Sequence, residues 1–226
     1  MLRDLLLKDN YAGFRSDVDL VVDAPDCDAF RKLMSDYGAV ENRFGGYALS
    51  TEWKADVWLL PRTWAHVAGY RQVAQLGDLL ETTFFNWDAI LYSLTKKKIM
   101  YKEGYLDNLD KRVLDINLEQ NPNRVGSCVR TLRAVLTWGG IITPRLAQFA
   151  VEVIDEVGAN TLLQAEKHSF KHRHILSAPI IEEASDVFQK AVYDDTLSKP
   201  LRAAAPGAQW QLPFYKEYTK KNHYAL

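Results

Sequence analysis

Two aspartates, Asp17 and Asp19, alternate with apolar residues in a segment that otherwise has the composition of a buried β-strand. Side chains two residues apart on a strand lie on the same face of the sheet. The two carboxylates are therefore predicted to point the same way, while Val18, Leu20 and Val22 point into a core. Carboxylates held side by side repel each other, and a hard divalent cation such as Mg²⁺ removes that repulsion by binding oxygens of both. The segment predicts a metal-binding pair at the edge of a sheet.

A third acid, Asp56, lies inside another strand-forming run, Lys54–Leu60. If this strand lies beside the first, three carboxylates meet at one sheet edge. Three such acids can hold two Mg²⁺ (or Mn²⁺) ions, one beside an attacking hydroxyl and one beside a triphosphate. Alternatively, Asp56 is a solvated side chain on the open face of the sheet. The nearby Asp17–Asp19 pair favours the metal site.

The composition places few further limits on function. The chain has 226 residues, of which 47% are hydrophobic and 25% charged, as in an ordinary water-soluble globular protein. Two distant cysteines and no secretory leader predict a reducing, cytoplasmic setting. No apolar run approaches the roughly 18 residues of a membrane span, so no membrane partner is expected.

The local patterns predict an α+β fold with a sheet-containing head over residues 1–80. Its predicted elements are a strand at Asp17–Asp23, a helix begun by Asp26 and stopped by Gly38, a hairpin around Gly45-Gly46, and a strand at Lys54–Leu60.

Residues 81–199 are predicted to form an all-helical neck and body, and residues 200–226 an irregular tail. The helix patterns begin already before this boundary, and a short hairpin is expected near Ile99–Tyr105. The predicted helices are Trp64–Leu80, Phe84–Leu94, Val125–Trp138, a helix from Thr143-Pro144 to Gly158, Asn160–Lys167 and Ile180–Tyr193.

Four ordered segments extend the pattern beyond the acids. They are Leu2-Arg3-Asp4-Leu5-Leu6-Leu7 with Ser16-Asp17-Val18-Asp19-Leu20-Val21-Val22-Asp23-Ala24, then Thr83-Phe84-Phe85-Asn86-Trp87-Asp88-Ala89, Leu106-Asp107-Asn108-Leu109-Asp110-Lys111-Arg112-Val113-Leu114, and Val129-Arg130-Thr131-Leu132-Arg133-Ala134. In this order they resemble the head and neck of bacterial-type CCA-adding enzymes and poly(A) polymerases. That family reads Gly-Gly-x-x-Arg-Asp-Leu-Leu-Leu, Asp-x-Asp-Leu-Val-x-x-Ala, Arg-Asp-Phe-Thr-x-Asn-Ala, Leu-x-Asp-Leu and Leu-Arg-x-x-Arg-Ala. The resemblance covers residues 1 to about 155.

The resemblance implies a polymerase-β-like nucleotidyltransferase head followed by a helical neck and body. It implies a transferase that moves a nucleoside monophosphate from ATP or CTP to the 3′ end of an RNA such as tRNA. Asp17, Asp19 and Asp56 would be the catalytic, Mg²⁺-binding acids. The residues implied to lie near the nucleotide are Arg3, Asp4, Arg15, Ser16, Asn86, Asp88, Arg130 and Arg133. The sequence leaves open whether the protein forms a homo-oligomer.

Two departures from the family pattern bear on activity. Gly126-Ser127 stand where the family has the Glu-Asp that chooses between CTP and ATP, so loose base choice is predicted. The family's Gly-Gly turn does not precede Arg3, which favours the alternative of a weak or inactive relative that binds RNA or a partner protein. A glycosyltransferase that holds a nucleotide sugar with Asp17-Val18-Asp19 is the third alternative.

A basic segment, His168–His174, follows the predicted helices of the body. Lys167, Lys171 and Arg173 alternate there with histidines, a weak indication of an RNA-binding loop. Two of the histidines are spaced i and i+4, as zinc ligands can be, but further ligands of suitable spacing are missing from the sequence around them. A solvated turn is the plainest interpretation.

Overall fold

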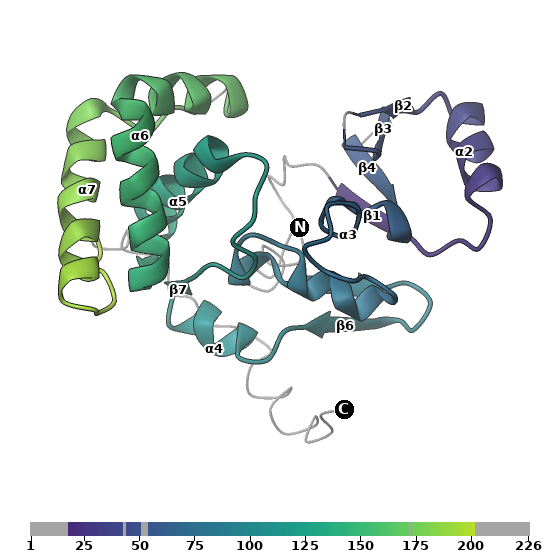
Figure 1. The fold of residues 1–226 in the computed structure, drawn as a ribbon, viewed down its shortest axis with the longest axis horizontal. Coiled ribbons are helices and arrows are strands. Elements are labelled where there is room, and N and C mark those ends of the chain that lie inside the picture. The colour runs from purple at the N-terminus through teal and green to yellow at the C-terminus, as the bar shows by residue number, and fades with distance from the viewer. Residues whose placement is uncertain (1–17, 43, 51–53, 172, 202–226) are drawn as a thin grey trace. The chain divides into compact units, whose positions relative to one another are not determined.

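The computed structural model describes residues 18–42, 44–50, 54–171 and 173–201 (Figure 1). The chain forms two compact units. Among the described residues, one unit contains residues 18–83 together with Ala89–Lys102, and the other contains Phe84–Asp88 and residues 103–201. The fold is mixed α+β, as predicted. Among the described residues, no helix combines the length and the apolar character needed to cross a bilayer.

The first unit is built on a four-stranded sheet whose order is β1-β4-β3-β2. The strands are β1 (Val18–Val22), β2 (Val40–Glu41), β3 (Tyr47–Ser50) and β4 (Lys54–Leu59). β1 runs parallel to β4, whereas β3 is antiparallel to both of its neighbours. The predicted strands and the predicted hairpin at Gly45-Gly46 are therefore confirmed within the described residues.

Helix α2 (Cys27–Asp36) covers one face of this sheet. Asp26 caps it as predicted, because its carboxylate accepts hydrogen bonds of 2.9 Å from the backbone N–H groups of residues 28 and 29. The buried side chains of Phe30 and Met34 pack on Val57 and Leu59 of the central strand β4. This cluster is the core of the sheet region.

Leu20 corrects the sequence prediction for β1, because its side chain is 39% exposed instead of lying in the core. Its register partner Val57 is only 3% exposed. Val57 lies on β4, between β1 and β3, so neighbours cover it from two sides, whereas Leu20 lies on the outer strand of the pair. Alternation alone therefore predicted the face correctly but not the degree of burial.

The predicted helix Trp64–Leu80 is wrong. The structure has a 3₁₀ turn, η1 (Leu60–Arg62), a short α3 (Trp64–Val67) and a second 3₁₀ segment, η2 (Leu76–Glu81). Gly69, with φ of +74°, reverses the chain after α3. The carboxylate of Asp78 then accepts hydrogen bonds from the backbone N–H groups of Ala74 and Gln75, which fixes a loop in place of a helix.

The predicted helix Phe84–Leu94 is also wrong. Its first part is the 3₁₀ turn η3 (Asn86–Asp88), and its second part is β5 (Ile90–Ser93). β5 pairs with β6 (Lys98–Tyr101) through the lysine-rich turn, so the predicted hairpin exists but begins earlier in the chain. The apolar spacing of this segment fits the period of a helix as well as that of a strand, and the hydrogen-bonded pairing with β6 makes it a strand.

The second unit packs three long helices: α5 (Arg124–Trp138), α6 (Pro144–Ser169) and α7 (Ala178–Tyr193). Gly139 ends α5 with φ of +60°, Thr143 caps α6, and Gly158 interrupts α6 with φ of +73°, so these predicted helices are confirmed. The short elements α4 (Tyr105–Asp110), β7 (Val113–Leu114) and β8 (Ile141–Ile142) complete the unit. Its fully buried side chains include Leu132, Leu146, Leu162 and Phe188.

Candidate functional site

Two of the predicted acidic residues lie opposite each other on the edge strand β1 and its neighbour β4. Asp19 of β1 and Asp56 of β4 are register partners in the parallel ladder, so the prediction that the two strands are neighbours is confirmed. Neighbouring strands lie about 4.8 Å apart, and paired residues on them share a face. The side chains of Asp19 and Asp56 therefore lie on one face of the sheet, on neighbouring strands.

The face that carries these acids is the one opposite α2. Val57 and Leu59 flank Asp56 on alternate positions and point into the α2 core, so Asp56 points the other way. On the far side of Asp56, β3 contributes its register partner Ala48, whose small, exposed side chain leaves room beside the carboxylate. Asp19, Asp56 and Ala48 thus form a row across three strands, and the acids lie at its β1 end.

The next row along the same face is apolar. Trp58 follows Asp56 by two residues, and its indole lies directly over the backbone of Gly46. A Cβ at Gly46 would come within 2.8 Å of three ring atoms of Trp58. The second glycine of the hairpin turn is therefore required by the packing of Trp58 beside the acidic row.

The rest of the predicted acidic and phosphate-binding set is N-terminal to β1. Asp17, Arg3, Asp4, Arg15 and Ser16 lie outside the described residues. Within residues 18–201, apart from the short gaps, no group of three or more His, Cys, Asp or Glu side chains is placed to hold a metal ion. The described structure supplies two members of the predicted trio, and the metal-binding role stays a prediction.

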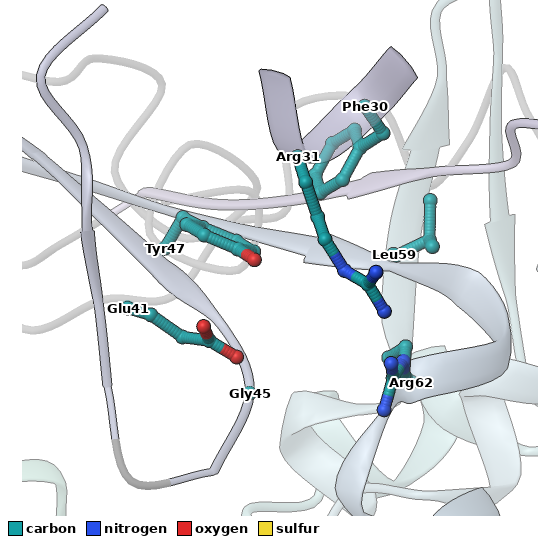
Figure 2. Close-up of a pocket in the computed structure, with 7 residues that line it drawn as sticks. All are labelled: Phe30, Arg31, Glu41, Gly45, Tyr47, Leu59 and Arg62. Carbon is teal, nitrogen blue, oxygen red and sulfur yellow. The ribbon is translucent and has the colours of Figure 1, made fainter. Parts of the chain in front are cut away.

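A shallow pocket lies on the opposite, α2-covered side of the first unit (Figure 2). Arg31 of α2 and Arg62 of η1 both extend into it, beside the ring of Tyr47. Because Leu59 in its lining points away from the Asp56 face, this pocket is separate from the acidic row. Its arginines are no part of the predicted metal site.

Two predicted nucleotide-binding residues, Asp88 and Arg130, are brought together in the second unit. Nη2 of Arg130 on α5 donates to Oδ2 of Asp88 at 2.5 Å, and the guanidinium lies 4.9 Å from the ring centre of Phe85. The side chain of Arg130 is still 47% exposed. The pair therefore orients Arg130 while leaving part of its guanidinium open to a ligand. A pair this exposed contributes little to stability, about 0–1 kcal/mol.

Asn86, also predicted to lie near the nucleotide, is used within the fold. Its amide nitrogen donates to the carbonyl of Val113 at 3.0 Å, and its amide oxygen accepts from the backbone N–H of Asp115 at 3.0 Å. The neighbouring Trp87 donates its indole N–H to the same Val113 carbonyl at 2.8 Å. Asn86 thus attaches η3 to the strand β7, and its nucleotide-binding role stays a prediction.

Arg133 lies in a buried ion pair instead of facing open solvent. Its guanidinium donates to Glu166 of α6, and it lies 3.8 Å from the centre of the Phe170 ring. The side chains of Arg133 and Glu166 are 14% and 1% exposed. Sequence reasoning did not select Glu166, although its position four residues after the buried Leu162 places a charged residue on the apolar face of α6.

The nucleophilic side chains next to Arg130 are inert. Ser127 and Cys128 are both buried, and burial raises the pKa of the Cys128 thiol to about 12. A thiol with such a pKa carries almost no thiolate at neutral pH. Covalent catalysis has no support at this position.

No protein-family model matches the sequence, and a comparison with curated proteins gives no match. Solved structures do match the fold. A tRNA-processing enzyme with CTP aligns with a TM-score of 0.52 at 16% identity, over 86% of this chain and 52% of that one. A CCA-adding enzyme in complex with CTP aligns with a TM-score of 0.54 at 15% identity, over 83% and 46%. An apo form of a tRNA-processing enzyme gives 0.51 at 17%, over 83% and 50%.

This chain therefore spans about half the length of the solved structures it matches. At 15–17% identity the likeness shows the fold. The predicted fold class and the predicted resemblance to CCA-adding enzymes are confirmed at that level.

Proposed function

We propose that this protein is a Mg²⁺-dependent nucleotidyltransferase that adds a nucleoside monophosphate from ATP or CTP to the 3′ end of an RNA. The observation that carries the proposal is the in-register pairing of Asp19 and Asp56 on parallel strands. A fold shared with CCA-adding and tRNA-processing enzymes supports it. Hard oxygen ligands on one face of a sheet are the donor set that Mg²⁺ takes together with substrate phosphates.

In this proposal Asp19 and Asp56, joined by Asp17, hold Mg²⁺ or Mn²⁺. When bound, the cation supplies positive charge against the triphosphate. Asp56 takes the proton of the RNA 3′-hydroxyl, whose oxygen forms a bond to the α-phosphorus. The bond from the α-phosphorus to the bridging oxygen breaks, and pyrophosphate leaves. The open position beside Ala48 gives the acceptor end access to Asp56.

Nucleotide selection in this proposal depends on α5. Arg130, oriented by Asp88 and Phe85, offers guanidinium donors to the nucleotide. The family carries the first of its two acidic side chains one turn before Arg130, at the position of Gly126. A Cβ at Gly126 would come within 2.3 Å of the side-chain nitrogen of Asn123. The Asn123 amide occupies this space because it caps α5 through the Gly126 N–H at 2.9 Å. Gly126 and Ser127 offer no acidic side chain for base choice, and Ser127 is buried, so ATP and CTP should both be used.

The test is incorporation of labelled ATP and CTP into an RNA oligonucleotide with Mg²⁺. Asp19→Asn and Asp56→Asn are each expected to lower turnover at least about 100-fold, because charge neutralisation at the α-phosphate is lost. Asp23→Asn, which removes an exposed carboxylate just after β1, is the matched control and should retain activity. Wild-type turnover in either site variant would refute the assignment, and strict use of one nucleotide would refute the loose base choice.

A catalytically inactive relative that binds RNA is the second candidate. The buried pairing of Arg133 with Glu166 favours it, since it occupies an arginine that the resemblance assigns to the nucleotide. Its signature would be RNA binding without detectable Mg²⁺–NTP binding by calorimetry. Supplying nucleotide sugars in parallel tests the glycosyltransferase alternative, which the shared fold disfavours.

A further inference from the structure

Three basic residues lie at the end of α6 and in the connection from α6 to α7, two helices of the second unit that Figure 1 labels. Lys167, Lys171 and Arg173 are all exposed. Between residues 157 and 181 the sequence has one carboxylate, Glu166, and that side chain is buried against Arg133. In the described part of the chain, none of these three cations forms an ion pair. Within the described residues, these three exposed charges are therefore available to an outside anion.

Helix stabilisation accounts for only part of this pattern. Lys167 lies in the last turn of α6, where the helix dipole favours a cation. Lys171 and Arg173 come after the helix has ended at Ser169, where the dipole has little effect. Two of the three charges therefore have no role within the secondary structure.

The backbone of residues 173–176 is anchored from inside by hydrogen bonds to two side chains. Glu166 accepts hydrogen bonds from the backbone N–H of Ile175 at 3.0 Å and of Leu176 at 3.1 Å. Arg133 donates to the carbonyl oxygen of Arg173 at 2.9 Å while also donating to Glu166. One buried pair thus fixes three backbone groups between residues 173 and 176. An ordered loop presents its cations without the entropy loss that a flexible one would incur on binding.

We infer that Lys167, Lys171 and Arg173 form a phosphate-binding surface for the RNA strand, and that the buried Arg133–Glu166 pair holds this surface in shape. The inference rests on the proposed function for its choice of RNA as the polyanion. In this assignment Arg133 is a positioning residue, which acts through Glu166 and the loop backbone. Phosphate contacts of this kind add affinity without reading the base sequence.

The experiment measures binding of a labelled RNA oligonucleotide to the full chain by fluorescence anisotropy across a range of KCl concentrations. EDTA is present and no nucleotide is added, so the result does not depend on nucleotidyl transfer. Each lost contact to a single strand lowers the slope of log K against log salt by about 0.7. The triple variant Lys167→Ala, Lys171→Ala, Arg173→Ala should therefore lose about 2 from the slope and bind roughly tenfold or more weakly at 0.1 M KCl.

The matched control removes the same charge from elsewhere on the same unit. Lys111, Lys190 and Lys199 are exposed and lie outside the segment. Their triple alanine variant should keep the wild-type slope and bind within about twofold of wild type. Equal weakening in both triples would show that net charge alone matters, and an unchanged slope in the segment triple would show that RNA binds elsewhere. Either result overturns the inference.

The positioning role is tested with all three cations still present. Arg133→Met with Glu166→Met removes both charges of the buried pair together, so that no unpaired buried charge remains, while the N–H groups of Ile175 and Leu176 lose their acceptor. With helix content confirmed by circular dichroism, this variant should still lose slope, because the loop backbone is no longer fixed. A wild-type slope in that folded variant would refute the role of the pair. Asp19→Asn should bind RNA normally, so loss of transfer and loss of this surface are distinguishable.

Discussion

Removing the charge of Glu166 should strongly destabilise the second unit. In Glu166→Gln one carboxylate oxygen becomes an NH₂ group that faces donors: Arg133 and the backbone N–H of Ile175 on one side, or the N–H of Leu176 on the other. A lost charge-assisted hydrogen bond costs about 1.5–3 kcal/mol, and a buried N–H without an acceptor costs about 1–3 kcal/mol. The sum agrees with the roughly 3–5 kcal/mol measured when one partner of a buried ion pair is removed. That is a large share of the 5–15 kcal/mol typical of a domain.

Urea unfolding followed by circular dichroism at 222 nm reports on this unit, because α5, α6 and α7 are the long helices of the described chain. Glu182→Gln, an exposed carboxylate on α7, is the control and should change the free energy of unfolding by less than about 0.5 kcal/mol. In the background Arg133→Met, the cost of Glu166→Gln should shrink by at least about 1 kcal/mol, since the paired charge is already absent. A cost below about 1 kcal/mol in the wild type, or the same cost in both backgrounds, would refute the reasoning.

Two further predictions concern ionisable groups. The backbone N–H groups of Ala74 and Gln75 lower the pKa of Asp78 below its ordinary value of 3.8. Its contribution to stability is therefore complete above the unfolded pKa and is lost as the pH falls through the lowered folded value. The difference in free energy of unfolding between wild type and Asp78→Asn should be constant near neutral pH and shrink below about pH 4, and a difference that grows on acidification would contradict this. Native protein should react with a thiol reagent at Cys27 only, because Cys128 is buried with its pKa raised to about 12. A Cys27→Ser variant that still reacts rapidly without denaturant would exclude this protection.

Elements with strong local signals were predictable from the sequence. The Asp26 cap fixed the start of α2, and Thr143 with Pro144 fixed the start of α6. The stretch from Trp64 to Leu94 failed because its apolar spacing suits either a helix or a strand. The structure there is decided by the hydrogen bonds that the Asp78 carboxylate accepts and by the pairing of β5 with β6. Both form between residues that a turn brings together, so the apolar spacing does not reveal them.

The candidate site shows the same division between local and long-range information. The sequence predicted that Asp19 and Asp56 lie on neighbouring strands, because each sits in a strong strand pattern. It did not predict that Arg133 would be buried, since the partner Glu166 is 33 residues away. A charged side chain on an apolar helix face was the available signal, and its partner could come only from the packing of α5 on α6.

The position of the acids depends on the core on the other side of the same strand. Val57 and Leu59 must face α2, and alternation then places Asp56 on the open face beside Asp19. A slip of one residue in β4 would bury Asp56 against Phe30 and expose Val57, exchanging a partly solvated carboxylate for an unpaired buried one. That cost specifies the register strongly. The hydrophobic pattern of β4 therefore sets the face on which Asp56 lies, and the register of the β1–β4 ladder places it opposite Asp19.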